Sequence, residues 1–229
     1  MTVYSYSGKG NRETNEDYIK SEIISDSISL HIVADGMGGY KYGEIAAQNA
    51  TEAISEFFAV YPIEHNIPQF IRQAIELANS MIFNLQNQYH TKLGTTIAGV
   101  LIINNTGYAF WLGDVQIQHF RDNKQLFISE SHSLINEMKG NGVVSAKDIE
   151  RYKNIVTKSL SGNTLDDNLP IIQLQLLPED VLCICSDGFY NSNEVSDLIS
   201  KQDVEIDKAL KLLEKSNEDN YSIVKITVS

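Results

Sequence analysis

Residues 30–39 read Leu30-His31-Ile32-Val33-Ala34-Asp35-Gly36-Met37-Gly38-Gly39. The mostly apolar run at 30–34 is typical of a strand, and Asp35 and Gly36 follow it directly. An Asp-Gly pair in this position is most often a turn, because Asp bonds its own backbone and Gly accepts a positive φ. An aspartate held by a rigid strand end can also project into a cleft. Both interpretations stay open for this stretch taken alone.

Other short apolar runs, rich in β-branched residues and bounded by Gly, Asn, Asp or Ser, also indicate strands. They are Ile23–Ile24, Ile97–Ile103, Tyr108–Leu112, Ile117–Phe120, Ile171–Leu176, Val181–Cys185 and Ile223–Val228. Helical spacing covers Gly43–Tyr61 and Pro68–Tyr89, and more weakly two pieces within Glu194–Leu213. Strands do not alternate strictly with helices, which disfavours a doubly wound parallel sheet and favours packed antiparallel sheets flanked by helices.

The stretch from Ser129 to Gly162 interrupts this pattern. It is polar, it contains two glycine breaks, and it shows modest helical spacing around Ile149 to Leu160. We expect an inserted, mobile subdomain there. No linker rich in Pro, Gly or Ser divides the chain, so residues 1–229 are predicted to form one domain.

The composition excludes several classes of partner. The formal net charge is −12, from 18 basic and 30 acidic residues, so we expect neither nucleic acid nor an anionic membrane as a partner. No stretch approaches the roughly 20 apolar residues that a membrane span needs. The first residues show no basic region followed by an apolar core, and we expect a cytoplasmic protein.

The two cysteines, Cys183 and Cys185, lie two positions apart in a predicted strand. Such residues share one face of the strand with Cα atoms roughly 6.5–7 Å apart, which is the limit for a disulfide. We predict two buried thiols in a reducing compartment rather than a disulfide or a zinc site.

Three further acidic patches lie beside predicted strands, as Asp35 does. They are Arg12-Glu13-Thr14-Asn15-Glu16-Asp17, Ser186-Asp187-Gly188 and Glu218-Asp219-Asn220. Each patch alone is more often a turn or a solvated loop. If the patches converge, their carboxylates repel one another strongly unless a cation neutralises them.

A converging set of this kind suits a hard divalent metal. Carboxylates, a backbone carbonyl and water are the ligands of octahedral magnesium or manganese. Glycine after Asp35 lets the backbone carbonyl approach a metal without obstruction. Two metals can lower the pKa of a bridging water and present it as hydroxide for in-line attack. Arg12 fits the same chemistry, because its planar fork matches the oxygens of a phosphoryl group.

Six motifs occur in order across almost the whole chain. They are Arg12-x-x-Asn15-Glu16-Asp17, Asp35-Gly36-Met37-Gly38-Gly39, Gly94-Thr95-Thr96, Gly113-Asp114, Ser186-Asp187-Gly188 and Asp219-Asn220. Their order and spacing resemble the metal-dependent protein phosphatase 2C family, above all its short bacterial serine/threonine phosphatases. The resemblance implies an α+β fold, a four-layer α-β-β-α sandwich of two central antiparallel sheets with helices outside. It also implies a binuclear metal site at one end.

The resemblance assigns the two ions of the binuclear site to five positions. Asp35 would bridge two Mn²⁺ or Mg²⁺ ions, and the carbonyl of Gly36 would bind one of them. Asp187 and Asp219 would hold the first ion, while Glu16 would support the second.

Further implied roles surround this pair of ions. Asp17 would bind metal-coordinated water, and Arg12 would bind the substrate phosphate. Asp114, together with Asp187, would hold a weaker third ion. The segment 129–162 corresponds to the mobile flap that these phosphatases carry beside the active site.

The implied activity is hydrolysis of phosphoserine and phosphothreonine in proteins, by activated water attacking phosphorus without a phosphoenzyme. The implied partners are phosphorylated proteins and an opposing serine/threonine kinase, and we expect a monomer. A catalytically inactive binding module is the alternative from another class. The acidic positions Glu16, Asp17, Asp35, Asp187 and Asp219 are all present, so we favour the enzyme. A phosphatase of small molecules also stays open, because substrate choice lies in the flap and surface grooves.

The chain departs from the family pattern at several positions. Tyr40 replaces a histidine, Val115-Gln116 replaces a Ser-Arg pair, and Ser131 replaces an aspartate in the flap. Met37 stands where some members carry a histidine that can serve as general acid, and Met cannot donate a proton. The third ion and the identity of the general acid therefore stay open, and no histidine is assigned a catalytic role.

Overall fold

The computed structural model describes residues 1–37, 42–63, 66–142, 144–152 and 154–229. Its strands are β1 (Thr2–Gly8), β2 (Asp17–Ser25), β3 (Ile28–Gly36), β4 (Thr95–Ile103), β5 (Thr106–Leu112), β6 (Gln116–Arg121), β7 (Lys124–Ile128), β8 (Ile171–Gln175), β9 (Val181–Cys185) and β10 (Tyr221–Thr227). Its helices are α1 (Gly43–Val60), α2 (Ile67–Tyr89), α3 (Leu134–Asn141), α4 (Ala146–Tyr152), α5 (Asp187–Tyr190), α6 (Ser196–Ile199) and α7 (Asp203–Leu213). The motif glycines Gly38 and Gly39, and the departure Tyr40, lie outside the described residues.

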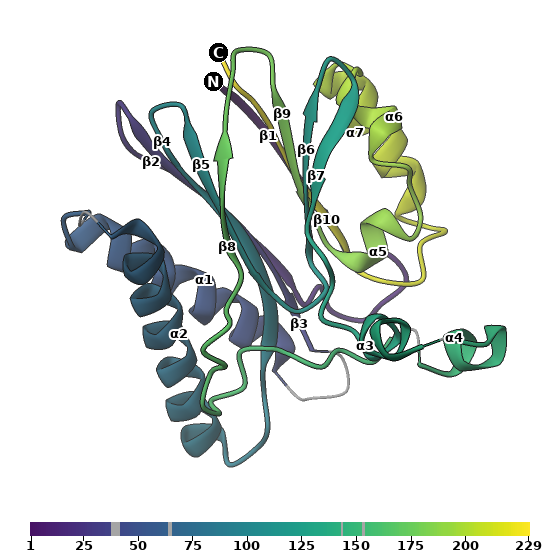
Figure 1. Ribbon diagram of the computed structural model, residues 1–229. Helices are drawn as coiled ribbons and strands as arrows, with labels where there is room; N and C mark the ends of the chain where they lie inside the picture. The colour runs from purple at the N-terminus through teal and green to yellow at the C-terminus, as the bar shows by residue number, and fades with distance from the viewer. Residues whose placement is uncertain (38–41, 64–65, 143, 153) are drawn as a thin grey trace.

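Two five-stranded sheets form the centre of the molecule (Figure 1). One has the strand order β1-β10-β9-β6-β7 and the other β2-β3-β4-β5-β8, and all neighbouring strands in both are antiparallel. Helices α1 and α2 cover the outer face of the second sheet, while α5, α6 and α7 lie against the first (Figure 1). The predicted α-β-β-α sandwich is confirmed.

Alternating side chains of the central strands fill the three spaces between these layers. In β4, Ile97 and Leu101 pack toward α1 and α2, whereas Ala98 and Val100 pack between the two sheets. Successive side chains of a strand point to opposite faces, so a strand covered on both sides must be apolar throughout. The same rule explains the continuous apolar runs that predicted β4, β9 and β10.

All of the predicted apolar runs lie wholly or largely in strands, and both long helices begin and end close to their predicted bounds. Strands β1 and β7 were not predicted from the sequence. Strand β1 alternates half-buried tyrosines with exposed residues and contains no apolar run. Strand β7 contains only the short run Leu126-Phe127-Ile128, whose outer members are exposed. Both are edge strands of the first sheet, which need only one apolar face.

The segment 129–162 carries α3 and α4, which lie outside the four layers (Figure 1), while Leu160 near its end is buried in the core against β4. The helical spacing predicted around Ile149 to Leu160 is wrong beyond Tyr152. There the chain forms isolated bridges, Ser133 with Val156 and Thr95 with Leu160, and hydrogen bonds to β4 replace helical ones. That this segment is mobile stays a prediction.

The two cysteines are buried and form no disulfide, as the sequence predicted. Cys183 and Cys185 are free thiols, buried on the face of β9 that packs against α5, α6 and α7. Burial raises the pKa of Cys183 to about 12, so this thiol is protonated at neutral pH. Among the described residues, none of the helices has the length and apolar composition needed to cross a bilayer.

Candidate metal centre

Strand pairing brings the four acidic patches to one end of the sandwich. Asp17, the first residue of β2, pairs directly with Asp35 near the end of β3. Strands β1 and β10 pair along their lengths, so the loop 9–16 after β1 lies beside the loop 214–220 before β10. The convergence that the sequence predicted is therefore observed.

A cavity of about 530 Å³ opens at this end, and we call it the acidic cavity. Most of the predicted site residues line it, namely Arg12, Glu16, Asp35, Gly36, Asp114, Asp187 and Asp219. Residues 154–156 of the inserted segment line the same cavity, which is where a flap beside the site would lie. Asp17 is not part of this lining, because it is buried beneath it.

Asp17 has a buried carboxylate with an unused oxygen. Its side chain is 7% exposed, and Oδ2 accepts a hydrogen bond from the hydroxyl of Ser186 at 2.8 Å. Within the described residues, Oδ1 is the one buried side-chain polar atom that has no hydrogen-bond partner. Burial, and then the charges of Asp219 and Asp114, raise the pKa of Asp17 to about 6 despite hydrogen bonds from Ser186 and Ser222. A buried, unpartnered acceptor is costly, so this oxygen points to a missing partner.

The carboxylates of the acidic cavity repel one another. Burial raises the pKa of Asp35 well above its usual value, and the charges of Asp17, Asp187 and Asp114 raise it further. Burial likewise raises the pKa of Asp187 to about 7, with Asp114 and Asp219 adding to the shift. These pKa shifts favour the protonated form of the buried carboxyl groups unless a cation neutralises them.

These residues fit a hard divalent cation. Within the described residues, no group of three or more His, Cys, Asp or Glu side chains is already closed around a point as a finished metal site. The carboxylates instead line a shared space, with an unpartnered oxygen behind them and only one arginine among them. An all-oxygen donor set of this kind suits Mg²⁺ or Mn²⁺.

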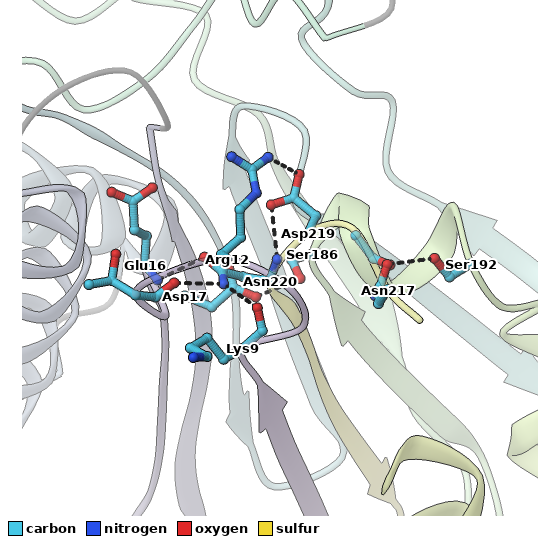
Figure 2. Close-up of polar contacts among 11 residues, drawn as sticks. Lys9, Arg12, Glu16, Asp17, Ser186, Ser192, Asn217, Asp219 and Asn220 are labelled. Carbon is cyan, nitrogen blue, oxygen red and sulfur yellow. Dashed lines mark hydrogen bonds and ion pairs between the residues drawn. The ribbon is translucent and has the colours of Figure 1, made fainter. Parts of the chain in front are cut away.

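Arg12 and Asp219 form an ion pair at the mouth of the acidic cavity. Arg12 Nη2 donates to Asp219 Oδ2 at 2.8 Å, and the side chains are 51% and 41% exposed (Figure 2). The residue implied for phosphate binding therefore contacts one implied for metal binding. A guanidinium has five N–H donors, which is more than this ion pair uses.

Backbone packing leaves no room for side chains around Gly36. A Cβ added to Gly36 would lie 2.4 Å from the backbone of Gly43, the first residue of α1. A Cβ added to Gly43 would in turn lie 2.7 Å from Glu16 Oε1, so the Glu16 carboxylate packs against the start of the helix. The hydroxyls of Thr95 and Thr96 donate to the Asp35 carbonyl at 2.8 and 3.3 Å, which fixes the end of β3. Glycine is required here by the close approach of β3 and α1.

Asn220 connects the two loops that carry the site, a function that the sequence analysis did not assign. Its Nδ2 donates to the carbonyls of Lys9 at 2.8 Å and Thr14 at 3.0 Å (Figure 2). Its Oδ1 accepts from the backbone N–H of Glu16 at 2.9 Å. Asn220 therefore positions the loop that carries Arg12. Its place after Asp219 in the motif was the only signal in the sequence.

Asp114 lines the same cavity as the other carboxylates, although the residues after it depart from the family pattern. Burial is the main cause that raises its pKa, and Tyr190 donates to its backbone carbonyl at 3.1 Å. His132 of the inserted segment accepts a hydrogen bond at Nδ1 from the backbone N–H of Gly113, at 3.1 Å. This histidine supports the Asp114 loop and does not line the acidic cavity.

Comparisons with known proteins identify the family of this chain. A family model described as "Protein phosphatase 2C" matches residues 6–220. Protein phosphatase PhpP of Streptococcus pneumoniae is 26% identical over 231 residues, covering 95% of this chain and 93% of the relative. Serine/threonine phosphatase stp of Listeria monocytogenes is 25% identical over 230 residues, covering 93% and 90%.

Solved structures show the same fold. The S. agalactiae serine/threonine phosphatase superimposes with a TM-score of 0.88 at 24% identity, covering 100% of this chain and 99% of that one. The catalytic domain of the serine/threonine protein phosphatase PstP, in complex with two manganese ions, superimposes with a TM-score of 0.81 at 20% identity, covering 100% and 98%. With most of its length matched by the family model, the chain belongs to the protein phosphatase 2C family.

Proposed function

We propose that this chain is a metal-dependent phosphatase of phosphoserine and phosphothreonine in proteins. The observation that carries the proposal is the acidic cavity, in which Asp35, Asp187 and their neighbours repel one another around a space that also exposes Arg12. The names of the relatives PhpP and stp, and the manganese-bound PstP, support the same activity.

Five residues would provide the ligands of the metal ions. Asp35, Asp187, Asp219, Glu16 and the carbonyl of Gly36 would hold two Mn²⁺ or Mg²⁺ ions. When bound, such ions supply Lewis acidity that lowers the pKa of an attacking water. A third, weaker ion at Asp114 stays a prediction.

Two residues would act on the substrate and on metal-coordinated water. The guanidinium of Arg12 would bind two phosphoryl oxygens and stabilise their charge as phosphorus is attacked. The unpartnered Oδ1 of Asp17, buried beneath the cavity, would accept a hydrogen bond from a metal-coordinated water. Direct attack by water needs no protein nucleophile, which agrees with the burial of Cys183 and Cys185 away from the cavity.

The physiological setting follows from this activity. We infer that the substrates are phosphorylated proteins and that a serine/threonine kinase opposes the enzyme. A cytoplasmic location and a monomeric state stay predictions from the sequence.

Phosphate release from a phosphothreonine peptide tests the proposal, with Mn²⁺ or with EDTA. We expect activity in Mn²⁺ and none in EDTA. Asp187→Ala should lower the rate at least about 100-fold, since loss of partners that only support metal ligands already costs roughly 10–100-fold. Asp26→Ala is the matched control, because Asp26 is an exposed residue in the turn between β2 and β3, outside the cavity lining.

Activity that survives EDTA, or that Asp187→Ala leaves unchanged, would contradict a metal-dependent hydrolase. Calorimetric titration with a phosphopeptide distinguishes an enzyme from a catalytically inactive binding module. Binding of a phosphopeptide without phosphate release at any Mn²⁺ concentration would identify a binding module instead.

A further inference from the structure

A second cavity, of about 290 Å³, adjoins the acidic cavity, and we call it the side cavity. Its lining consists of Met37, Gln86, Lys92, Val156, Thr157, Ser159, Ser161 and Asn163. Met37 and Val156 line both cavities and so form their common edge. A peptide with a phosphorylated residue in the acidic cavity would therefore bring its neighbouring residues to the side cavity. The volume is suited to one side chain rather than to a separate small-molecule ligand.

The two cavities differ in charge. The lining of the acidic cavity includes five carboxylates, whereas the described lining of the side cavity has none and its one charged residue is Lys92. The uncharged groups are mainly hydroxyls and amides, which can donate hydrogen bonds. A cavity whose described lining has a lysine and no carboxylate is suited to an anionic group, although the net charge of the chain is −12.

Lys92 has its ammonium group available for a ligand. It is exposed, and within the described part of the chain no ion pair or hydrogen bond occupies its side chain. The nearby Lys158 differs, because its Nζ pairs with Asp166 Oδ2 at 2.8 Å. Among the described residues that line the side cavity, Lys92 is therefore the cation that a substrate can bind without displacing a protein carboxylate.

The wall of the side cavity is held in place by α2. Asn79 donates through Nδ2 to the carbonyl of Asn163 at 2.6 Å and accepts through Oδ1 from the backbone N–H of Ser161 at 3.2 Å. Gln86 donates through Nε2 to the carbonyls of Leu93 at 2.7 Å and Ser161 at 2.9 Å. Gln86 therefore ties the backbone beside Lys92 to the opposite wall. A wall fixed by the buried amide of Asn79 and the half-buried amide of Gln86 costs little to order when a ligand binds.

We propose that the side cavity is a subsite for an anionic side chain of the substrate, close in sequence to the phosphorylated residue. Lys92 binds the anion, and the hydroxyls of Thr157, Ser159 and Ser161 donate to it. This inference rests on the proposed function, because the phosphorylated residue in the acidic cavity sets the position of the peptide. The anion is a carboxylate of Asp or Glu, or a second phosphoryl group, since both are acceptors of the same kind.

The test uses phosphothreonine peptides in matched sets. Each set places Gln, Glu or a second phosphothreonine at one position from −3 to +3, and kcat/KM is measured with Mn²⁺ for wild type, Lys92→Gln and Lys92→Glu. Lys124→Gln is the matched control, because Lys124 is an exposed lysine of β7 outside both cavities. The hydrolysis of p-nitrophenyl phosphate, which has no flanking residue, reports whether the catalytic site is intact.

At one or two positions, we expect wild type to prefer Glu over Gln by about threefold, the size of a partly exposed charge pair. Lys92→Gln should remove this preference and Lys92→Glu should reverse it, while neither changes p-nitrophenyl phosphate hydrolysis. A stronger effect of the second phosphothreonine would identify a phosphoryl group as the preferred anion. Equal activity toward Glu and Gln peptides in wild type, or a preference that persists in Lys92→Gln, would overturn the subsite.

Fluorescence anisotropy of the same peptides separates this inference from the proposed function. If wild type releases no phosphate but binds Glu peptides more tightly than Lys92→Gln does, the subsite stands and the hydrolase is wrong. If phosphate is released and binding is the same for all variants and peptides, the hydrolase stands and the subsite is wrong.

Discussion

Strand β9 has an aspartate beyond each of its ends, and the two carboxyl groups are in opposite electrostatic environments. Asp180, directly before the strand, is fully buried and bonded to Arg121 at 2.7 Å, to His119 at 2.9 Å and to the backbone N–H of Leu177 at 2.9 Å. Burial alone would raise its pKa, but these bonds lower it to about 2. The pKa of Asp187, just after the strand, is instead raised to about 7.

The two aspartates differ in the partners that the chain provides for their carboxyl groups. At Asp180 the chain supplies its own cation and donors, so the carboxylate is satisfied and stabilises the fold. At Asp187 the chain surrounds the carboxyl group with other carboxylates and withholds the cation. A buried aspartate without a cation of its own, a few residues from one that has a cation, supports the proposal that Asp187 binds an external cation.

Removing the satisfied aspartate should have the largest effect on stability. Asp180→Ala leaves His119 and Arg121 without their shared partner, and breaking such a buried pair costs about 3 kcal/mol or more. Urea unfolding measures this loss. Glu56→Ala, on the exposed face of α1, is the control and should stay within about 0.5 kcal/mol of wild type. A loss at Asp180 no larger than at Glu56 would show that the two ends of β9 do not differ in this way.

Binding of a metal cation in the acidic cavity should have the second largest effect on stability. Mn²⁺ at 100 times its Kd should add about 2.7 kcal/mol to the free energy of unfolding of wild type. Asp35→Asn should lose most of this gain, because it removes a lining carboxylate on which the charges of the other aspartates of the site act. Thermal unfolding with and without Mn²⁺ measures both. Equal stabilisation of the variant would place the metal elsewhere.

Replacing the Asp187 carboxyl group by a neutral amide should stabilise the metal-free protein. A carboxyl pKa of about 7 in the folded state, against an ordinary 3.8, means that stability is lost as the pH rises from about 4 through 7. Asp187→Asn removes that loss, and one pKa unit corresponds to about 1.4 kcal/mol. In EDTA at pH 8 we therefore expect a gain of about 1 kcal/mol or more, vanishing near pH 4. Asp180 has the opposite sign, since its contribution is lost only as the pH falls through about 2.

The sequence predicted the acidic site because order along the chain carries information that single motifs lack. Asp35-Gly36 could be a turn, but six motifs in family order could not be six independent turns. The register that makes Asp17 face Asp35 follows from the β2–β3 hairpin, whose apolar runs were readable.

The sequence could not distinguish Asp180 from other surface-like aspartates. Its partners His119 and Arg121 lie about 60 residues earlier, and the β6–β9 pairing of His119 with Leu182 is what brings them together. Asn220 was hidden for a similar reason, since its bonds reach the carbonyls of Lys9 and Thr14 more than 200 residues away. Every residue has a backbone carbonyl, so the residue types in the sequence do not indicate which carbonyls accept these bonds.

The ion pair between Arg12 and Asp219 should contribute least to stability, although it lies in the acidic cavity. Both side chains are about half exposed, and exposed pairs contribute about 0–1 kcal/mol. In EDTA we expect Arg12→Met to change the free energy of unfolding by less than about 0.5 kcal/mol, while KM for a phosphopeptide rises. Arg12→Lys should keep the stability but not restore KM, because a single ammonium cannot match the bidentate fork. A loss of stability as large as that of Asp180→Ala would instead make Arg12 the cation that the acidic cavity was thought to lack.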